Sequence, residues 1–129
     1  MDGRATVRIV LADDEPAVLE ALVGLFASAL QMEVVATATT GDQLVDAIAE
    51  HSPALVVTDV YMPGGGEELF DRLAVLDPKP FVIAVSGMAS PNLRRRLTAA
   101  GADRLLRKGL DNPLTVAMDA FAAPLPIAD

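Results

Sequence analysis

The sequence contains no cysteine and no tryptophan, and aromatic side chains make up only 4% of its 129 residues. The absence of cysteine excludes a disulfide framework and any metal site built from thiolates. Because aromatic side chains are so few, the core has to be built mainly from alanine, valine, leucine and isoleucine. The apolar fraction of 52% is nevertheless large enough for a sizeable core, and the length suits one domain rather than two.

Histidine is also scarce, because His51 is the single one in the chain. A cluster of histidine ligands and histidine-based catalysis are therefore excluded, and we expect His51 at the surface near a helix end. No apolar run reaches the roughly 18 residues that a membrane span needs, and the N-terminus lacks the pattern of a secretory signal. We expect a cytoplasmic protein with no membrane contact. The formal net charge of −8 opposes direct nucleic-acid binding, because a phosphate backbone attracts basic surfaces.

Short runs rich in valine, isoleucine and leucine alternate along the chain with longer runs of helical periodicity. The predicted strands are 6–12, 33–39, 54–58, 80–85 and 104–107, and the predicted helices are 16–30, 42–50, 67–76, 91–100 and 112–121. Such alternation predicts right-handed crossovers and a parallel sheet covered by helices on both faces. The expected fold class is α/β, a single doubly wound five-stranded parallel sheet flanked by five helices. Residues 1–123 are predicted to form this domain, and 124–129 a C-terminal tail or the start of a linker.

Polar side chains follow the predicted strands at the points where the strands end. Asp13 and Asp14 follow the first strand, Asp59 the third, Ser86 the fourth and Lys108 the fifth. In an open parallel sheet, ligands bind outside the carboxyl ends of the strands, so we expect these groups to converge there.

The chemistry of such a cluster follows from its charge. Three neighbouring aspartates repel one another unless they take up protons or bind a cation. Oxygen ligands without histidine or cysteine suit a hard ion, Mg²⁺ or Mn²⁺. A carboxylate beside such an ion is a nucleophile toward phosphorus and forms an acyl phosphate. The ammonium of Lys108 would offset the charge of the transferred group, and Ser86 would donate a hydrogen bond to it.

The order of these motifs resembles the response-regulator receiver domain of two-component signal transduction over about residues 6–121. The matching segments are Asp13-Asp14-Glu15-Pro16, Thr58-Asp59-Val60-Tyr61-Met62-Pro63, Val85-Ser86-Gly87, Gly101-Ala102-Asp103 and Leu105-Leu106-Arg107-Lys108. Each segment alone is weak evidence, but all of them in this order and at these strand ends are specific.

The resemblance implies a flavodoxin-like fold and a phosphoprotein whose phosphoacceptor is Asp59. A histidine kinase or a phosphotransfer protein would supply the phosphoryl group. Mg²⁺ would be held by Asp14, Asp59 and the backbone carbonyl of Tyr61, with Asp13 contributing through water. Lys108 would bind the transferred group.

The resemblance also implies a switch in which Ser86 moves toward the phosphoryl group and changes the surface of the fourth helix, fifth strand and fifth helix. This sequence departs from the family at Leu105, where Tyr or Phe is usual, and at Gly109, where Pro is usual. The loop after Pro63 is about one residue shorter than usual. A degenerate receiver that acts as a protein-interaction or dimerisation module is therefore the alternative. A homodimer and a downstream effector domain or protein are further expectations.

Two other classes of protein are disfavoured, and we expect no enzyme. Phosphatases of the haloacid-dehalogenase type need an acid two residues after the nucleophile, where Tyr61 stands here. A dinucleotide-binding fold needs a glycine-rich first turn, whereas the acidic run at 13–15 repels phosphate. The glycines at 64–66 lack the lysine of a P-loop, so we interpret them as a flexible loop beside the site.

Overall fold

The structure is a computed structural model that describes residues 6–122. Five strands form one parallel sheet in the order β2-β1-β3-β4-β5. The strands are β1 (Val7–Ala12), β2 (Met32–Ala38), β3 (Leu55–Asp59), β4 (Phe81–Ser86) and β5 (Arg104–Arg107). The strand order reverses between β1 and β3, so a crevice is expected outside their carboxyl ends. The predicted fold class is confirmed, and the predicted segment 124–129 lies outside the described residues.

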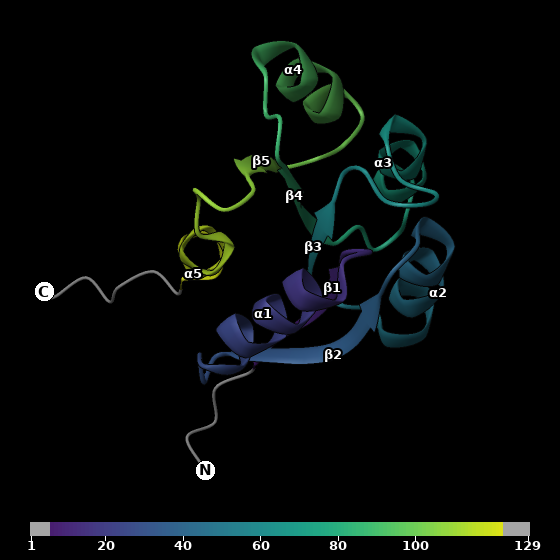
Figure 1. The fold of residues 1–129 in the computed structure, drawn as a ribbon. Helices are drawn as coiled ribbons and strands as arrows, with labels where there is room; N and C mark the ends of the chain where they lie inside the picture. The colour runs from purple at the N-terminus through teal and green to yellow at the C-terminus, as the bar shows by residue number, and fades with distance from the viewer. Residues whose placement is uncertain (1–5, 123–129) are drawn as a thin grey trace, which may run out of the picture.

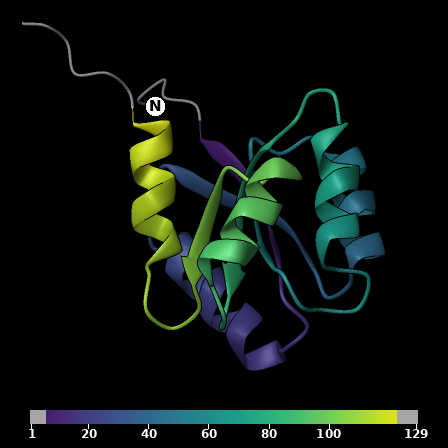
Figure 2. The same ribbon diagram turned by 90° about the horizontal axis from the view of Figure 1, so that it is seen from above.

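The helices lie on both faces of the sheet. They are α1 (Pro16–Ala27), α2 (Gly41–His51), α3 (Glu67–Ala74), α4 (Pro91–Ala99) and α5 (Pro113–Phe121). Figures 1 and 2 show α1 and α5 on one side of the sheet and α2, α3 and α4 on the other. None of the helices in the described part of the chain combines the length and the apolar character of a membrane-crossing segment.

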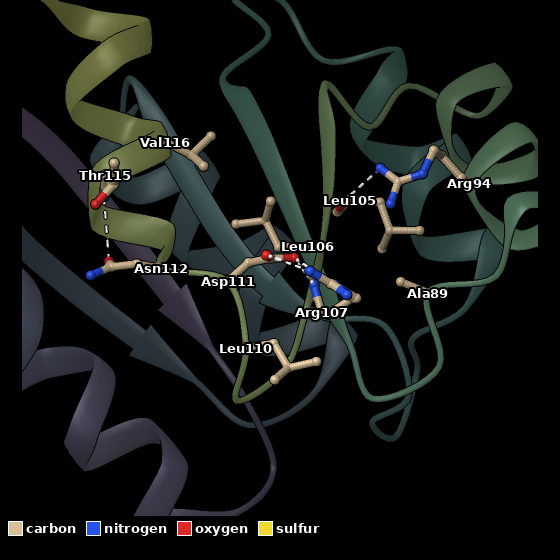
Figure 3. Close-up of a pocket in the computed structure, with 10 residues that line it drawn as sticks. All are labelled: Ala89, Arg94, Leu105, Leu106, Arg107, Leu110, Asp111, Asn112, Thr115 and Val116. Atoms are coloured by element: carbon tan, nitrogen blue, oxygen red, sulfur yellow. Dashed lines mark hydrogen bonds and ion pairs between the residues drawn. The ribbon is translucent and has the colours of Figure 1, made fainter.

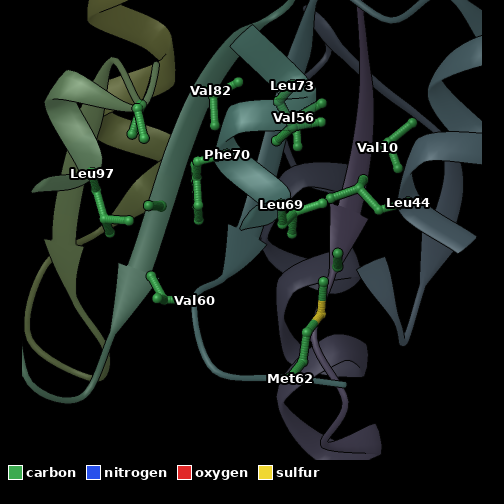
Figure 4. Packing of buried hydrophobic residues seen from close by; sticks show 14 of the residues in the cluster. Val10, Leu44, Val56, Val60, Met62, Leu69, Phe70, Leu73, Val82 and Leu97 are labelled. Atoms are coloured by element: carbon green, nitrogen blue, oxygen red, sulfur yellow. The ribbon is translucent and has the colours of Figure 1, made fainter. Parts of the chain in front are cut away.

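Each face of the sheet has its own hydrophobic core, as the apolar strands lead one to expect for a sheet covered on both sides. On the α2–α3–α4 side, Val56 and Val82 of the sheet pack with Leu44, Phe70 and Leu97 from the three helices (Figure 4). On the α1–α5 side, the sheet residues Ile9, Val57 and Ile83 pack with Phe26 and Ala117. The two layers hold the strands in place, so the residues at the strand ends keep fixed relative positions.

Two helices end at least two residues earlier than the periodicity predicts, and α4 ends one residue earlier, at Ala99. Helix α1 was expected to reach Leu30, but it ends at Ala27, where the hydroxyl of Ser28 donates to the carbonyl of Leu25 at 2.6 Å. This local bond satisfies a carbonyl at the end of the helix. Leu30 lies beyond that end and is exposed. The helix predicted to 76 ends at 74, because the backbone tightens into a turn before Pro78, which cannot continue a helix.

Polar side chains define the starts of three helices. Thr40 accepts a hydrogen bond from the backbone of Gln43, and Ser90 accepts one from Leu93. The last helix begins one residue later than predicted because Asn112 is its N-cap and accepts from two backbone amides of the first turn. Such caps satisfy amides that have no partner within the helix.

Two strands end one residue later than predicted, and both additions are residues of interest. Asp59 pairs with Val85 as the last residue of β3, and Ser86 pairs with Arg107 as the last residue of β4. Both side chains are therefore placed by the sheet ladder rather than by a loop. Regular strands hold side chains more precisely than loops do.

The glycine-rich segment after β3 is more ordered than its composition predicts. The amide of Gly65 donates to Met62 at 2.8 Å, and that of Gly66 donates to Val60 at 2.8 Å. The amide of Gly41, the first residue of α2, donates to Pro63 at 2.8 Å. These three backbone bonds tie the loop to itself and to α2.

Candidate functional site

The carboxyl ends of β1, β3 and β5 bring three aspartates and one lysine together. Asp13 and Asp14 follow β1, and Asp59 ends β3. One carboxylate oxygen from each of the three lies within 4.8 Å of the others. Asp13 and Asp59 are buried, whereas Asp14 is exposed. The cluster therefore has two fixed carboxylates at its floor and a third one open to solvent.

Lys108, just after β5, reaches across this cluster with its ammonium group. Its Nζ lies 2.9 Å from Asp13, 3.3 Å from Glu15 and 3.5 Å from Asp59. The contact with Glu15 is one to which the sequence analysis assigned no role. The only sequence signal for it is the position of Glu15 directly after the two aspartates, since its partner lies 93 residues away.

The charges in this cluster are only partly balanced. Burial of Asp59 raises the pKa of its carboxyl, and the nearby carboxylate of Asp13 raises it further. The charge of Lys108 and the hydrogen bonds from the Tyr61 amide and from Lys108 oppose this increase but do not cancel it. Burial lowers the pKa of Lys108, but the hydrogen bond to Asp13 and the charges of Asp59 and Asp13 outweigh burial and raise it. Lys108 therefore stays protonated, and its charge does not fully offset the effects that raise the pKa of Asp59.

Backbone amides donate hydrogen bonds to the two buried carboxylates and orient them. Asp13 accepts from the amide of Glu15 at 2.9 Å, which directs its other oxygen toward Lys108. Asp59 accepts from the amide of Tyr61 at 3.4 Å through one oxygen and faces Lys108 with the other. The oxygen of Asp59 that faces Lys108 thus has a defined direction before any ligand arrives.

Ser86 lies at the end of β4 and is fully buried. Its hydroxyl accepts a hydrogen bond from the amide of Met88 at 3.1 Å, and its carbonyl accepts one from the amide of Lys108 at 2.8 Å. Leu105 is also buried and packs in the α2–α3–α4 core. The carboxylate of Asp59 accepts hydrogen bonds from Tyr61 and Lys108. Ser86 therefore lies next to the acidic cluster but makes no hydrogen bond to the Asp59 carboxylate.

Gly109 follows Lys108 with a φ of 80°, and the space around its Cα is open. A proline ring holds φ near −65°, so the family's usual residue would not fit this backbone. The departure from the family at this position is therefore a different local path of the chain, and it leaves the Lys108 side chain directed into the acidic cluster.

The donor set fits a hard divalent cation. Three carboxylates converge without histidine or cysteine, which is the ligand chemistry of Mg²⁺ or Mn²⁺ rather than of zinc. The carboxylate of Asp13 adds to the effect of burial in raising the pKa of Asp59, and the charge of Lys108 does not fully offset these two effects. A cation at this edge of the sheet would remove that imbalance.

Comparison with known proteins identifies the family. The family model for the response regulator receiver domain matches residues 9–118. The chain is 33% identical over 86 residues to a protein-glutamate methylesterase/protein-glutamine glutaminase of Nitrosospira multiformis, covering 66% of this chain and 24% of that protein. It is 31% identical over 104 residues to the response regulator GacA of Pseudomonas viridiflava, covering 80% of this chain and 49% of that protein.

A solved structure has the same fold. The receiver domain of the response regulator NarL from Mycobacterium tuberculosis superimposes with a TM-score of 0.85 at 23% identity, covering 91% of this chain and 97% of that one. The chain therefore belongs to the response-regulator receiver family of two-component systems. It spans a quarter to about half of the length of these two curated relatives, so their other activities are properties of those proteins.

Proposed function

We propose that this chain accepts a phosphoryl group on Asp59 and acts as the switch of a two-component system. The observation that supports this most directly is the carboxylate of Asp59 itself. It is buried at the end of β3, lies 3.5 Å from the ammonium of Lys108, and shares its surroundings with the oxygens of Asp13 and Asp14. Because the carboxylate of Asp59 would accept the phosphoryl group and keep it as a signal, we infer a signalling role rather than an enzymatic one.

The transfer step is a displacement at phosphorus. An oxygen of Asp59 forms a bond to the phosphorus of a phosphohistidine on a histidine kinase or phosphotransfer protein. The phosphorus–nitrogen bond breaks, and its electron pair returns to the imidazole nitrogen, which takes up a proton. Lys108 pairs with the transferred oxygens, and Ser86 donates a hydrogen bond to one of them.

Asp14, Asp59 and the backbone carbonyl of Tyr61 are the ligands that we propose for Mg²⁺, or for Mn²⁺, with Asp13 contributing through water. The cation supplies charge neutralisation for the transferred group. The residues of the chain do the remaining work. Asp13 orients Lys108 through their 2.9 Å contact, and the amide of Tyr61 holds Asp59 in place.

Asp14→Ala should weaken Mg²⁺ binding by about tenfold or more, since loss of a ligand costs at least as much as loss of a supporting residue. Glu20→Ala on α1 removes an equally exposed acid outside the cluster and is the matched control. Isothermal titration with Mg²⁺ measures both. Equal affinities for the two variants would refute Asp14 as a ligand.

Movement of Ser86 toward the phosphoryl group would couple the site to the face formed by α4, β5 and α5. Ser86 belongs to β4 and is followed by the loop 87–90 that leads into α4. We infer that this face contacts a downstream effector domain or protein, or a second copy of the chain, without direct contact to nucleic acid. Cytoplasmic histidine kinases or phosphotransfer proteins are the proposed donors.

One observation favours the alternative of a degenerate receiver that works as an interaction module. Leu105 is a buried aliphatic residue where the family usually has a rotating aromatic one. An aliphatic side chain in a packed core has no polar group to exchange between two environments. If nothing else couples α4 to the site, phosphorylation would leave the α4–β5–α5 face unchanged.

Binding of beryllofluoride with Mg²⁺, followed by NMR, separates these two functions. Beryllofluoride imitates a phosphoryl group on an aspartate. A working switch should show large amide shifts at Ser86 and along α4. A protein that does not bind the mimic would contradict the proposal for Asp59, whereas shifts confined to the acidic cluster would favour the interaction module.

A further inference from the structure

The side chain of Arg94 links helix α4 to the backbone of β5. The guanidinium of Arg94 donates a hydrogen bond from Nη1 to the backbone carbonyl of Leu105 at 2.9 Å (Figure 3). The two neighbouring arginines have other contacts. Arg95 bonds to Asn92 of its own helix, and Arg96 pairs with Glu67 at the start of α3. Within residues 6–122, Arg94 is thus the arginine of this run that links α4 to the edge strand.

The contact lies at the position where this chain departs from its family. The side chain of Leu105 is only 4% exposed and packs with Leu93 and Leu97 of α4. It therefore lacks a polar group that could signal by changing its hydrogen-bond partners. Arg94 instead bonds to the backbone carbonyl of Leu105. The backbone of β5 is therefore connected to α4, whereas the side chain of Leu105 only packs in the core.

An open groove lies beside the guanidinium of Arg94. The groove has a volume of about 640 Å³, and both Arg94 and Asp111 line it, together with Leu110 and Thr115. Asp111 is already bound to Arg107, whose hydrogen bonds lower the pKa of its carboxyl most strongly, and the charge of Arg94 adds to that effect. The groove therefore gives the Arg94 side chain space to move away from the Leu105 carbonyl.

The backbone at Arg94 is connected to Ser86, beside the proposed phosphorylation site, through the loop 87–90 and the first turn of α4. Ser86 accepts a hydrogen bond from Met88, and Ser90 caps α4 four residues after Ser86. The amide of Arg94 donates to the carbonyl of Ser90 at 2.9 Å, so Arg94 belongs to the first turn of the helix. A shift of Ser86 breaks its bond to Met88 and pulls on the end of α4 that carries Arg94.

We propose that Arg94 is the positioning residue that couples α4 to β5 in this chain, holding the resting arrangement through the Leu105 carbonyl and releasing that carbonyl when Asp59 is phosphorylated. This inference rests on the proposed function. Because the contact with Leu105 stabilises only the resting arrangement, it opposes binding of a phosphoryl mimic. A ligand shifts such an equilibrium by its differential affinity for the two states, so removal of the contact makes the mimic bind more tightly.

The test compares Arg94→Ala with Arg95→Ala, which removes the same type of side chain from the next position of α4, where it is also exposed. Beryllofluoride is titrated in Mg²⁺ against each variant and the wild-type protein, with NMR as the readout. Arg94→Ala should bind the mimic roughly 3- to 10-fold more tightly, the range that one hydrogen bond of ordinary strength gives. Arg95→Ala should match the wild-type protein.

Equal affinities for Arg94→Ala and Arg95→Ala would overturn the role of Arg94. A role in stability alone would lower the melting temperature of Arg94→Ala and leave the affinity unchanged, which also overturns the proposal. Failure of the wild-type protein to bind would instead overturn the proposed function, and the inference with it.

Discussion

Asp59→Asn should abolish the uptake of a phosphoryl group from acetyl phosphate in Mg²⁺. The amide has the size of the carboxylate but no anionic oxygen to attack phosphorus, while Lys108 and Asp13 keep their 2.9 Å contact. Intact mass spectrometry measures the uptake directly, as the addition of one phosphoryl group to the wild-type protein. Asp71→Asn on the exposed surface of α3 is the matched control and should still be phosphorylated.

The same variant should be folded and more stable than the wild-type protein, which excludes unfolding as the reason for lost uptake. Burial, and then the charge of Asp13, raise the pKa of Asp59 above its unfolded value. An acidic group whose pKa is raised in the folded state does not lower the free energy of unfolding at a pH below its unfolded pKa. Above that pH it lowers the free energy of unfolding, and this penalty grows as the pH rises through the folded pKa. At neutral pH without Mg²⁺, which is above the unfolded pKa, the penalty is present, and asparagine removes it.

Thermal unfolding in Mg²⁺-free buffer measures this gain. For a domain of this size, each kcal/mol recovered raises the melting temperature by about 3–6 °C. The difference between wild type and variant should shrink at acidic pH, where Asp59 is protonated in both the folded and the unfolded state. A phosphorylated Asp59→Asn protein, seen as the same increase in mass, would show that the acceptor is another residue.

Gly41→Ala should destabilise the protein by about 3 kcal/mol, in the upper part of the range for overpacking. A Cβ at this position would overlap the carbonyl oxygen of Gly64 and lie 2.7 Å from its carbonyl carbon. Both atoms belong to the backbone of the loop that leaves Asp59, and the amide of Gly41 bonds to Pro63 at 2.8 Å. Neither side can move without breaking the bonds that hold the loop.

Gly24→Ala provides the control with the opposite sign. Gly24 lies inside α1 and is exposed, and a Cβ added to it would have no neighbouring atom within 4 Å. Alanine there should stabilise the protein by roughly 0.5–1 kcal/mol, because glycine is a poor helix former. Urea unfolding of both variants measures the two effects. An unchanged midpoint for Gly41→Ala would mean that the loop after β3 is free to move away from α2.

The alternation of strands and helices was predictable because it depends on local patterns. Apolar runs such as 54–58 and helical periodicity such as 91–100 are properties of neighbouring residues, and parallel topology follows from the alternation itself. The ends of elements were less predictable. Leu30 continues the apolar pattern of α1, but Ser28 bonds to the carbonyl of Leu25 and ends the helix first. Competition between side-chain and backbone bonds decides such ends, and periodicity does not record it.

What the sequence by itself determined is the set of polar groups at the strand ends, since Asp13, Asp14, Asp59 and Lys108 follow apolar strands whose carboxyl ends meet at one edge. The tertiary structure alone decided which of them touch. It paired Lys108 most closely with Asp13, packed Gly41 against the Gly64 backbone, and joined Arg94 to the Leu105 carbonyl. These contacts join residues that are far apart in the chain, and their geometry depends on how whole layers pack, which no local pattern of residues encodes.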